Sequence, residues 1–257
     1  MKQADGADRS NGPIEPLGDG ALLIRIGERI DDTLNRHALE LADLLCQSRL
    51  PGIQDVSAAY ASVCVRYDTA AWADPSRLQS PYERVADAIA ELIRRAKVDI
   101  AYAAAPHSIV EGSRRRGETD SVEIPVCYGG HHGADIERVA ELAGIDAETV
   151  IARHSAGVYR VAMLGFMPGF AYLLGLDPTL NVPRRPTPRT RVPAGSVAIG
   201  GAQTGIYPRD LPGGWQLIGR TPLTLFDPRR ARPALLSPGQ PVRFRTIDPD
   251  EFARQSS

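Results

Sequence analysis

The side chains best suited to ligand chemistry in this 257-residue sequence lie in its second half, beginning with a proline-rich arginine segment. Residues 182–196, VPRRPTPRTRVPAGS, carry Arg184, Arg185, Arg189 and Arg191 among four prolines. Because proline restricts the backbone, these guanidinium groups are held on a stiff scaffold. Such groups can bind a carboxylate or a phosphate through paired N–H donors. A solvated loop is the alternative, and the sequence leaves both interpretations open.

A second unusual segment, LGFMPGFAYLLG (164–175), precedes the arginine segment. Gly169 follows Pro168 in what we expect to be a turn, and Phe166, Phe170 and Tyr172 would supply aromatic walls. The functional interpretation is a loop that faces a ligand. A tight turn packed on the core is the alternative, and periodicity alone favours it.

A glycine cluster, GGAQTG (200–205), follows the apolar run SVAI. Its glycines would let a ligand approach the backbone, and Gln203 offers an amide donor and acceptor. Tyr207 follows, and Trp215 opens a later strand after the turn 212–214. The cluster contains neither GKS/T nor GxGxxG, so no nucleotide-binding motif is indicated.

Histidines and cysteines give weaker signals. His154 closes a predicted helix, where a histidine more often complements the helix dipole than acts as a base. His131 and His132 lie in a GGHHG loop without a metal-binding spacing, so no metal site is expected. The three cysteines are far apart, which indicates neither a disulfide framework nor a zinc motif, and Cys127 is expected to be buried and structural.

Charge is distributed unevenly along the chain. Residues 155–247 contain twelve arginines and three acidic residues, a local balance of +9, although the net charge of the whole chain is -1. The near-neutral total argues against a globally basic nucleic-acid binder. The local excess is explained either by a solvated arginine-rich surface or by an anionic ligand.

The first hundred residues predict a small α/β module. After a polar tail (1–12), a strand is expected at 20–27 and a helix from the capping pair Asp31–Asp32 to Pro51. An extended stretch at 56–67 and a helix at 81–98 complete a β–α–β–α order. The predicted domain spans 13–105, and a polar linker follows at 106–121.

The remainder, 122–250, predicts a β-rich domain. A strand at 122–128 precedes two short helices that begin at the capping residues Asp135 and Asp146. Beyond Tyr159, short apolar runs are separated by proline or glycine, a pattern typical of a barrel or a sandwich. These runs are VAMLGF, SVAIGG, WQLIG, TPLTLF, PALL and PVRFRTI.

No targeting or membrane segment is expected. The N-terminus lacks the apolar core of a signal peptide, and the most apolar stretch, 161–176, is too short to span a bilayer. A soluble cytoplasmic protein with reduced cysteines is the prediction.

Taken in order, these segments resemble the family of the 5-oxoprolinase B subunit. This family is also known as allophanate hydrolase subunit 1, includes an inhibitor of a sporulation histidine kinase, and matches half of the carboxyltransferase domain of urea carboxylase. The residues that carry the resemblance are IPVCYGG (124–130), HS and Y (154–159), GFMPGFAYLLGLD (165–177), VPRRPTPRTRVPAGSVAIGG (182–201), QTGIYP (203–208), PGGWQLIGRTPL (212–223), and LFDP with PALLSPG (225–239).

The resemblance implies an α+β protein in which a small α/β domain precedes a cyclophilin-like β-barrel. It implies a non-autonomous hydrolase subunit that acts with a larger C subunit and a separate A subunit. Together they would open 5-oxo-L-proline to L-glutamate at the expense of ATP, which the complex would bind. The alternatives are a regulatory module that inhibits a histidine kinase and a subunit of an allophanate hydrolase or urea carboxylase system.

On this basis His154 and Gln203 are the expected catalytic residues. The sequence departs from the family pattern at two places, which leaves the identity of the substrate open. These are His131–His132 after YGG and Gly201-Ala202-Gln203 in the glycine cluster. The expected substrate-binding residues are Phe166, Pro168, Gly169, Phe170, Tyr172, Arg189, Arg191, Ser196, Tyr207 and Arg220.

Overall fold

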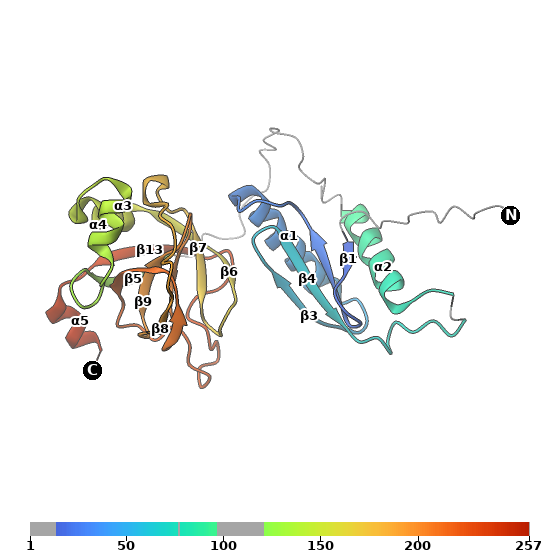
Figure 1. The fold of residues 1–257 in the computed structure, drawn as a ribbon. Helices are drawn as coiled ribbons and strands as arrows, with labels where there is room; N and C mark the ends of the chain where they lie inside the picture. The colour runs from blue at the N-terminus through green and yellow to red at the C-terminus, as the bar shows by residue number, and fades with distance from the viewer. Residues whose placement is uncertain (1–13, 77, 97–120, 257) are drawn as a thin grey trace. The chain divides into compact units, whose positions relative to one another are not determined.

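The computed structural model describes residues 14–76, 78–96 and 121–256. The chain divides into two compact units, Met1–Glu111 and Gly112–Ser257 (Figure 1). This division falls inside the predicted linker 106–121. That linker, except for Ser121, lies outside the described residues, as does the predicted tail 1–12.

The first unit is a four-stranded antiparallel sheet with two helices, and the strands are ordered β1-β2-β4-β3. Inward-facing residues of β2 and β4 form one apolar core with both helices. Both predicted helices are confirmed. The elements are β1 (Ile14–Pro16), β2 (Ala21–Arg25), α1 (Asp32–Ser48), β3 (Ile53–Ala58), β4 (Ser62–Tyr67) and α2 (Pro81–Ala96).

Helix α1 begins where the sequence indicates. The Asp31 side chain accepts hydrogen bonds from the backbone N–H groups of Thr33 and Leu34 at 2.9 and 3.1 Å. These bonds satisfy donors that a helix N-terminus otherwise leaves unpaired.

The prediction of one extended stretch over 56–67 is wrong, because the chain forms a hairpin there. β3 and β4 pair antiparallel, with Val56 opposite Val65, and the Ala59 N–H donates to the Ser62 carbonyl at 2.8 Å. The reversal contains neither glycine nor proline, so the sequence carried none of the usual turn signals.

The second unit is the predicted β-barrel, closed by seven strands in the order β10-β7-β6-β13-β5-β12-β9 (Figure 1). Only the β13–β5 pair is parallel, and the other barrel pairs within the described residues are antiparallel. The barrel strands are β5 (Val122–Tyr128), β6 (Val158–Leu164), β7 (Ala171–Leu174), β9 (Ser196–Ile199), β10 (Thr204–Ile206), β12 (Gln216–Arg220) and β13 (Pro241–Thr246).

Helices and a small two-stranded sheet complete this unit. β8 and β11 pair antiparallel in this separate sheet. The remaining elements are α3 (Ile136–Ala143), α4 (Ala147–Ala156), a short 3-10 helix (Pro178–Leu180), β8 (Arg189–Val192), β11 (Leu211–Gly213) and the C-terminal helix α5 (Pro249–Gln255).

Two of the predicted barrel strands are not strands. The runs TPLTLF and PALL are joined only by an isolated bridge between Phe226 and Ala234. Pro222, Pro228 and Pro233 interrupt this region, and proline cannot donate to a β ladder.

Alternation along the barrel strands separates two apolar layers. On β7, Ala171 and Leu173 join the inner core, whereas Tyr172 packs against a second cluster on the other face. That second cluster includes Ala198 and Leu217 from the barrel and Val192 and Leu211 from the β8–β11 sheet. The small sheet therefore covers part of the barrel wall with apolar side chains.

The helices within the described ranges include none that is long and apolar enough to cross a membrane.

Candidate functional site

A cluster of aromatic rings gathers three of the predicted substrate-binding residues, together with Trp215, on the outer barrel face. Phe170 lies at its centre, with ring centroids 4.7 Å from Tyr172, 5.1 Å from Tyr207 and 5.9 Å from Trp215. The contacts with Tyr207 and Trp215 are edge-to-face, the arrangement that aromatic quadrupoles favour. Phe170, Tyr207 and Trp215 are buried, whereas Tyr172 is half-buried. The cluster is a rigid wall with little open surface.

The glycines of GGAQTG make room for this wall. A Cβ on Gly200 would lie 2.7 Å from ring atoms of Trp215, and a Cβ on Gly205 would lie 3.2 Å from the same ring. Sequence reasoning placed a ligand against this backbone. The structure places the Trp215 indole there, because the ring occupies the space that the missing side chains leave.

Gln203 combines burial with an amide that is free to bind. The residue is 6% exposed, and its position two residues before Gly205 puts the side chain on the Trp215 side of the barrel. Its amide forms no side-chain hydrogen bond with any residue in 14–76, 78–96 or 121–256. A nearly buried amide without a protein partner is suited to bind a ligand or a water molecule.

Arg184 lies over the aromatic wall. Its guanidinium carbon is 5.4 Å from the centroid of the Trp215 ring, within the range of a cation–π contact. The side chain makes no ion pair with the described part of the chain. Its N–H donors therefore stay available to an anion, which distinguishes Arg184 from the other arginines of the segment.

Arg185 and Arg189 bind a protein carboxylate instead. Arg189 places both terminal nitrogens 2.8 Å from the two oxygens of Asp135, and Arg185 reaches the same carboxylate at 3.0 Å. The Leu217 backbone N–H also donates to Asp135 at 2.7 Å. The prediction that Asp135 caps its helix is wrong, because the side chain makes no capping bond and turns to these partners.

The charge of Asp135 is stabilised by these contacts. Its side chain is 5% exposed, and burial alone would raise the pKa of the carboxyl group. The hydrogen bonds from Arg189 and Leu217, together with the charges of Arg189 and Arg185, lower that pKa below its usual value. This carboxylate therefore joins the start of α3, the proline-rich segment and β12.

His154 lies inside the barrel core, away from the aromatic wall. It is 0% exposed, its Nδ1 lies 2.7 Å from the Tyr128 hydroxyl and its Nε2 lies 2.9 Å from the Thr204 hydroxyl. Because the Thr204 hydroxyl donates to the Ala198 carbonyl, it accepts from Nε2, and Nδ1 then accepts from Tyr128. Burial lowers the pKa of His154 to about 3, so the ring is neutral near pH 7.

Other predicted site residues lie in separate places. Arg191 is exposed and pairs with Asp210 at the surface, while Ser196 is 1% exposed within β9. Arg220 donates to the Ala194 carbonyl at 2.7 Å and lies over Phe252 of α5. Of these three residues, Ser196 contacts the aromatic wall through its backbone, because its carbonyl accepts from the Tyr207 N–H at 2.9 Å.

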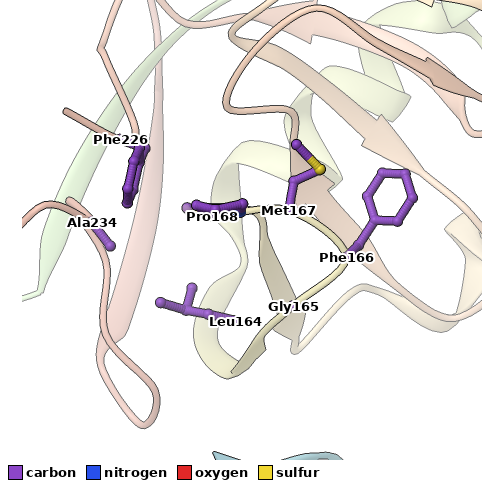
Figure 2. A pocket seen from close by; sticks show the side chains of 8 residues that line it. Leu164, Gly165, Phe166, Met167, Pro168, Phe226 and Ala234 are labelled. Carbon is purple, nitrogen blue, oxygen red and sulfur yellow. The ribbon is translucent and has the colours of Figure 1, made fainter. Parts of the chain in front are cut away.

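Phe166, Pro168 and Gly169 form one side of a hollow that we call the apolar hollow (Figure 2). Its volume is about 400 Å³. No titratable side chain lines it, so it offers no side-chain partner to a carboxylate. The lining residues are Leu164, Gly165, Phe166, Met167, Pro168, Gly169, Phe226 and Ala234.

Among the described residues, the other histidines and the cysteines form no metal centre. His132 is 7% exposed, and its ring contacts those of His131 and Phe252 at tilted angles. Cys127 is buried, as predicted. Within the part of the chain that the structure describes, no three histidine, cysteine, aspartate or glutamate residues group as metal ligands would.

Sequence reasoning missed Asp135 and Trp215 as determinants of the site. Asp135 was interpreted as a local cap, because its partners are 50 and 54 residues away in sequence. The signal for Trp215 was present in the two glycines, which are spaced to admit a large ring.

Comparison with known proteins gives a consistent result. Residues 13–236 match the family model of the carboxyltransferase domain, subdomain C and D. The chain is 41% identical over 241 residues to the B subunit of 5-oxoprolinase from Bacillus subtilis, and the match covers 93% of this chain and 94% of that relative.

Two solved structures have a similar fold. The crystal structure of TTHA0988 superposes with a TM-score of 0.69 at 36% identity, over 89% of this chain but only 40% of TTHA0988. The urea amidolyase of K. lactis superposes with a TM-score of 0.70 at 19% identity, over 94% of this chain and 15% of that enzyme. This second likeness concerns the fold alone.

The Asp135 contacts predict a large cost for neutralising this carboxylate. We expect Asp135→Asn to lower the free energy of unfolding by about 3 kcal/mol, because Arg185 and Arg189 lose their shared counter-charge in a largely buried setting. Asp210→Asn is the matched control and should cost much less, because its pair with Arg191 is exposed. Urea unfolding of the two variants would measure both values, and equal costs would contradict the proposed role of Asp135.

The burial of His154 predicts a loss of stability in acid. An unfolded histidine takes up a proton near pH 6.5, whereas the folded His154 resists protonation until about pH 3. The unfolded state therefore binds more protons within that window, and His154 lowers stability by up to about 1.4 kcal/mol for each pH unit below 6.5. Nitrogen-15 NMR of the ring should report a neutral Nε2–H tautomer at pH 5. A His154 signal that titrates above pH 5 would contradict this assignment.

Proposed function

The chain belongs to the family of the carboxyltransferase domain, subdomain C and D, and on that premise we propose that it is the B subunit of an ATP-dependent 5-oxoprolinase. The observation that carries the proposal is the 41% identity to the Bacillus subtilis B subunit, which extends over 94% of that relative. A B subunit implies further subunits, and the larger C subunit and the A subunit are the partners proposed here. The likeness to urea amidolyase supports the assignment of the fold and gives no information about the substrate of this chain.

The proposed reaction is hydrolysis of a cyclic amide. Water adds to the lactam carbonyl carbon of 5-oxo-L-proline, the carbon–nitrogen bond breaks, and the nitrogen takes a proton to give L-glutamate. ATP hydrolysis accompanies the step in the complex. The present sequence has no nucleotide-binding motif, so the proposal assigns ATP binding to the assembly with its partners.

Arg184 and Gln203 are the side chains that best fit this substrate. The guanidinium of Arg184 can bind the carboxylate of 5-oxoproline while its charge rests on Trp215. The free amide of Gln203 can pair with the lactam, which presents one N–H donor and one carbonyl acceptor. Tyr172, the half-buried ring of the wall, would limit the space between them.

His154, Arg189 and Arg191 receive other roles in this proposal. His154 has no exposed surface, so it serves to hold Thr204 and β10 in place. Arg189 would have to leave Asp135 before it could bind a substrate, and Arg191 projects into solvent beside Asp210. Among the four arginines of the segment, Arg184 therefore needs the least rearrangement to bind a carboxylate.

The proposal predicts a selective loss of substrate affinity. In a complex reconstituted from this chain with the A and C subunits, Arg184→Ala should raise the KM for 5-oxoproline by about tenfold or more. Loss of a hydrogen bond to a charged group costs about 1.5–3 kcal/mol. Gln203→Ala should raise KM by a smaller factor, because the lost bond is between neutral groups. ATP-dependent release of glutamate is the measurement.

Arg243→Ala serves as the control, because Arg243 is an exposed arginine of β13 outside the site. It should leave KM within twofold of the wild-type value. Unchanged kinetics in an Arg184→Ala plus Gln203→Ala double variant would reject the substrate contacts. Absence of any 5-oxoproline hydrolysis by the complete wild-type mixture would reject the proposed function itself.

A further inference from the structure

The apolar hollow is chemically unsuited to the substrate proposed above. Its two walls are the loop 164–169 and the pair Phe226 and Ala234, and Figure 2 shows Pro168 facing Phe226 across it. A small molecule with a carboxylate and a lactam would meet no polar side chain there. The shape and lining suit one or two apolar side chains instead.

The loop that forms one wall is held firmly in place. Gly169, with φ +83°, packs its backbone so closely on the opposite wall that a Cβ would lie 2.6 Å from the Phe226 Cβ. Within the loop, the Met167 N–H donates to the Gly165 carbonyl at 2.7 Å and the Phe170 N–H donates to the Met167 carbonyl at 3.0 Å. The hollow is therefore formed before any partner arrives, which lowers the entropy lost on binding.

Phe166 adds an exposed ring beside the hollow. It is 62% exposed and has φ +67°, a left-handed conformation that is unfavourable for a side chain of this kind. Figure 2 shows its ring on the far side of the loop from Phe226. Such an exposed and strained aromatic residue contributes little to folding, so a role in binding explains it better.

The hollow has a cationic rim. Phe226 and Ala234 are bridged, and the segment 227–233 between them, DPRRARP, carries three arginines and one acid, a balance of +2. The acid, Asp227, is already bound by Arg229 through two contacts of 3.0 Å. Arg230 and Arg232 are both exposed, and neither makes an ion pair with residues in the described ranges.

We propose that the apolar hollow and its arginine rim, residues 164–169 and 226–234, form a docking surface for the C subunit. The segment that docks would insert an aromatic or aliphatic side chain between Pro168 and Phe226, with acidic residues beside it to meet Arg230 and Arg232. The charge of the rim selects this chemistry, because it attracts acidic chains and disfavours basic ones. The inference rests on the proposed function, since it takes the C subunit as the partner.

The length of a relative supports a partner of this kind. The similar region makes up 40% of TTHA0988, so more than half of that chain lies outside the match. A domain of this type therefore exists joined to a larger amount of additional protein. A separate C subunit would supply the equivalent neighbour to the present chain.

The test measures binding of the full-length chain to recombinant C subunit by isothermal titration calorimetry. Ala234→Trp fills the hollow, and Arg230→Glu with Arg232→Glu reverses the rim. Each should raise Kd at least tenfold. Arg243→Glu with Arg254→Glu makes the same change in charge on β13 and α5, and should leave Kd within twofold. Raising NaCl from about 50 to about 500 mM should weaken wild-type binding more than binding by the rim variant, because salt screens the rim.

A third variant tests the docking surface without filling the hollow. Phe166→Asn keeps a residue that tolerates positive φ and removes the exposed ring. It should raise Kd about tenfold while Tm stays within about 2 °C of the wild-type value. If Ala234→Trp fails to fold, this variant and the rim variant decide the question.

The outcomes separate docking from function. Wild-type binding that the hollow, rim and Phe166 variants leave unchanged overturns the docking surface, even if the complex hydrolyses 5-oxoproline. Absence of binding between the wild-type chain and the C subunit also overturns it. Variants that change only self-association assign the surface to a second copy and overturn it as well. Variant-sensitive binding without hydrolysis of 5-oxoproline supports the docking surface and rejects the proposed function.

Discussion

The buried carboxylate of Asp135 is the interaction on which the arrangement of this site depends. It accepts hydrogen bonds from Arg185, Arg189 and the Leu217 backbone, so one side chain joins α3, the proline-rich segment and β12. The backbone N–H of Arg185 also donates to the Gly214 carbonyl at 2.7 Å, and the side-chain amide of Gln216 donates to the Pro183 carbonyl at 3.0 Å. These bonds fix the segment on both sides of Arg184, which is why that guanidinium can rest over Trp215. Four prolines stiffen the segment, but the carboxylate determines where it lies.

Arginine therefore plays three different parts in the second unit. Arg185 and Arg189 are structural, because both bind the carboxylate of Asp135 in a partly buried setting. Arg184 is held by an aromatic ring and keeps its donors available. The arginines of segment 227–233 are exposed at the rim of an apolar hollow. The local excess of +9 is thus divided among arginines in these three different settings.

The same loop, 164–170, separates the two surfaces for which functions are proposed. Phe170 forms the centre of the aromatic wall, whereas Pro168 faces the apolar hollow. Phe166 is edge-to-face with Phe170 at 5.6 Å, so its exposed ring is continuous with the wall. A partner docked at the hollow would therefore lie beside the proposed substrate contacts.

The sequence by itself determined the classes of element and the family. Capping at Asp31, helical periodicity in 81–98 and proline-punctuated apolar runs predicted two helices and a barrel or a sandwich, because these signals act over a few residues. The family resemblance selected the barrel. The order of the motif blocks was sufficient for the family, which the match over residues 13–236 confirms. The hairpin at 53–67 escaped prediction because its turn contains neither glycine nor proline.

Tertiary structure alone decided which polar residues are free. Asp135 meets Arg185 and Arg189 across 50 and 54 residues, and His154 meets Thr204 across 50. No local pattern reveals such pairs, because closure of the barrel creates them. The sequence therefore supplied the arginines and the glutamine, and packing determined that Arg184 and Gln203 remain available while Arg189 and His154 are already bound.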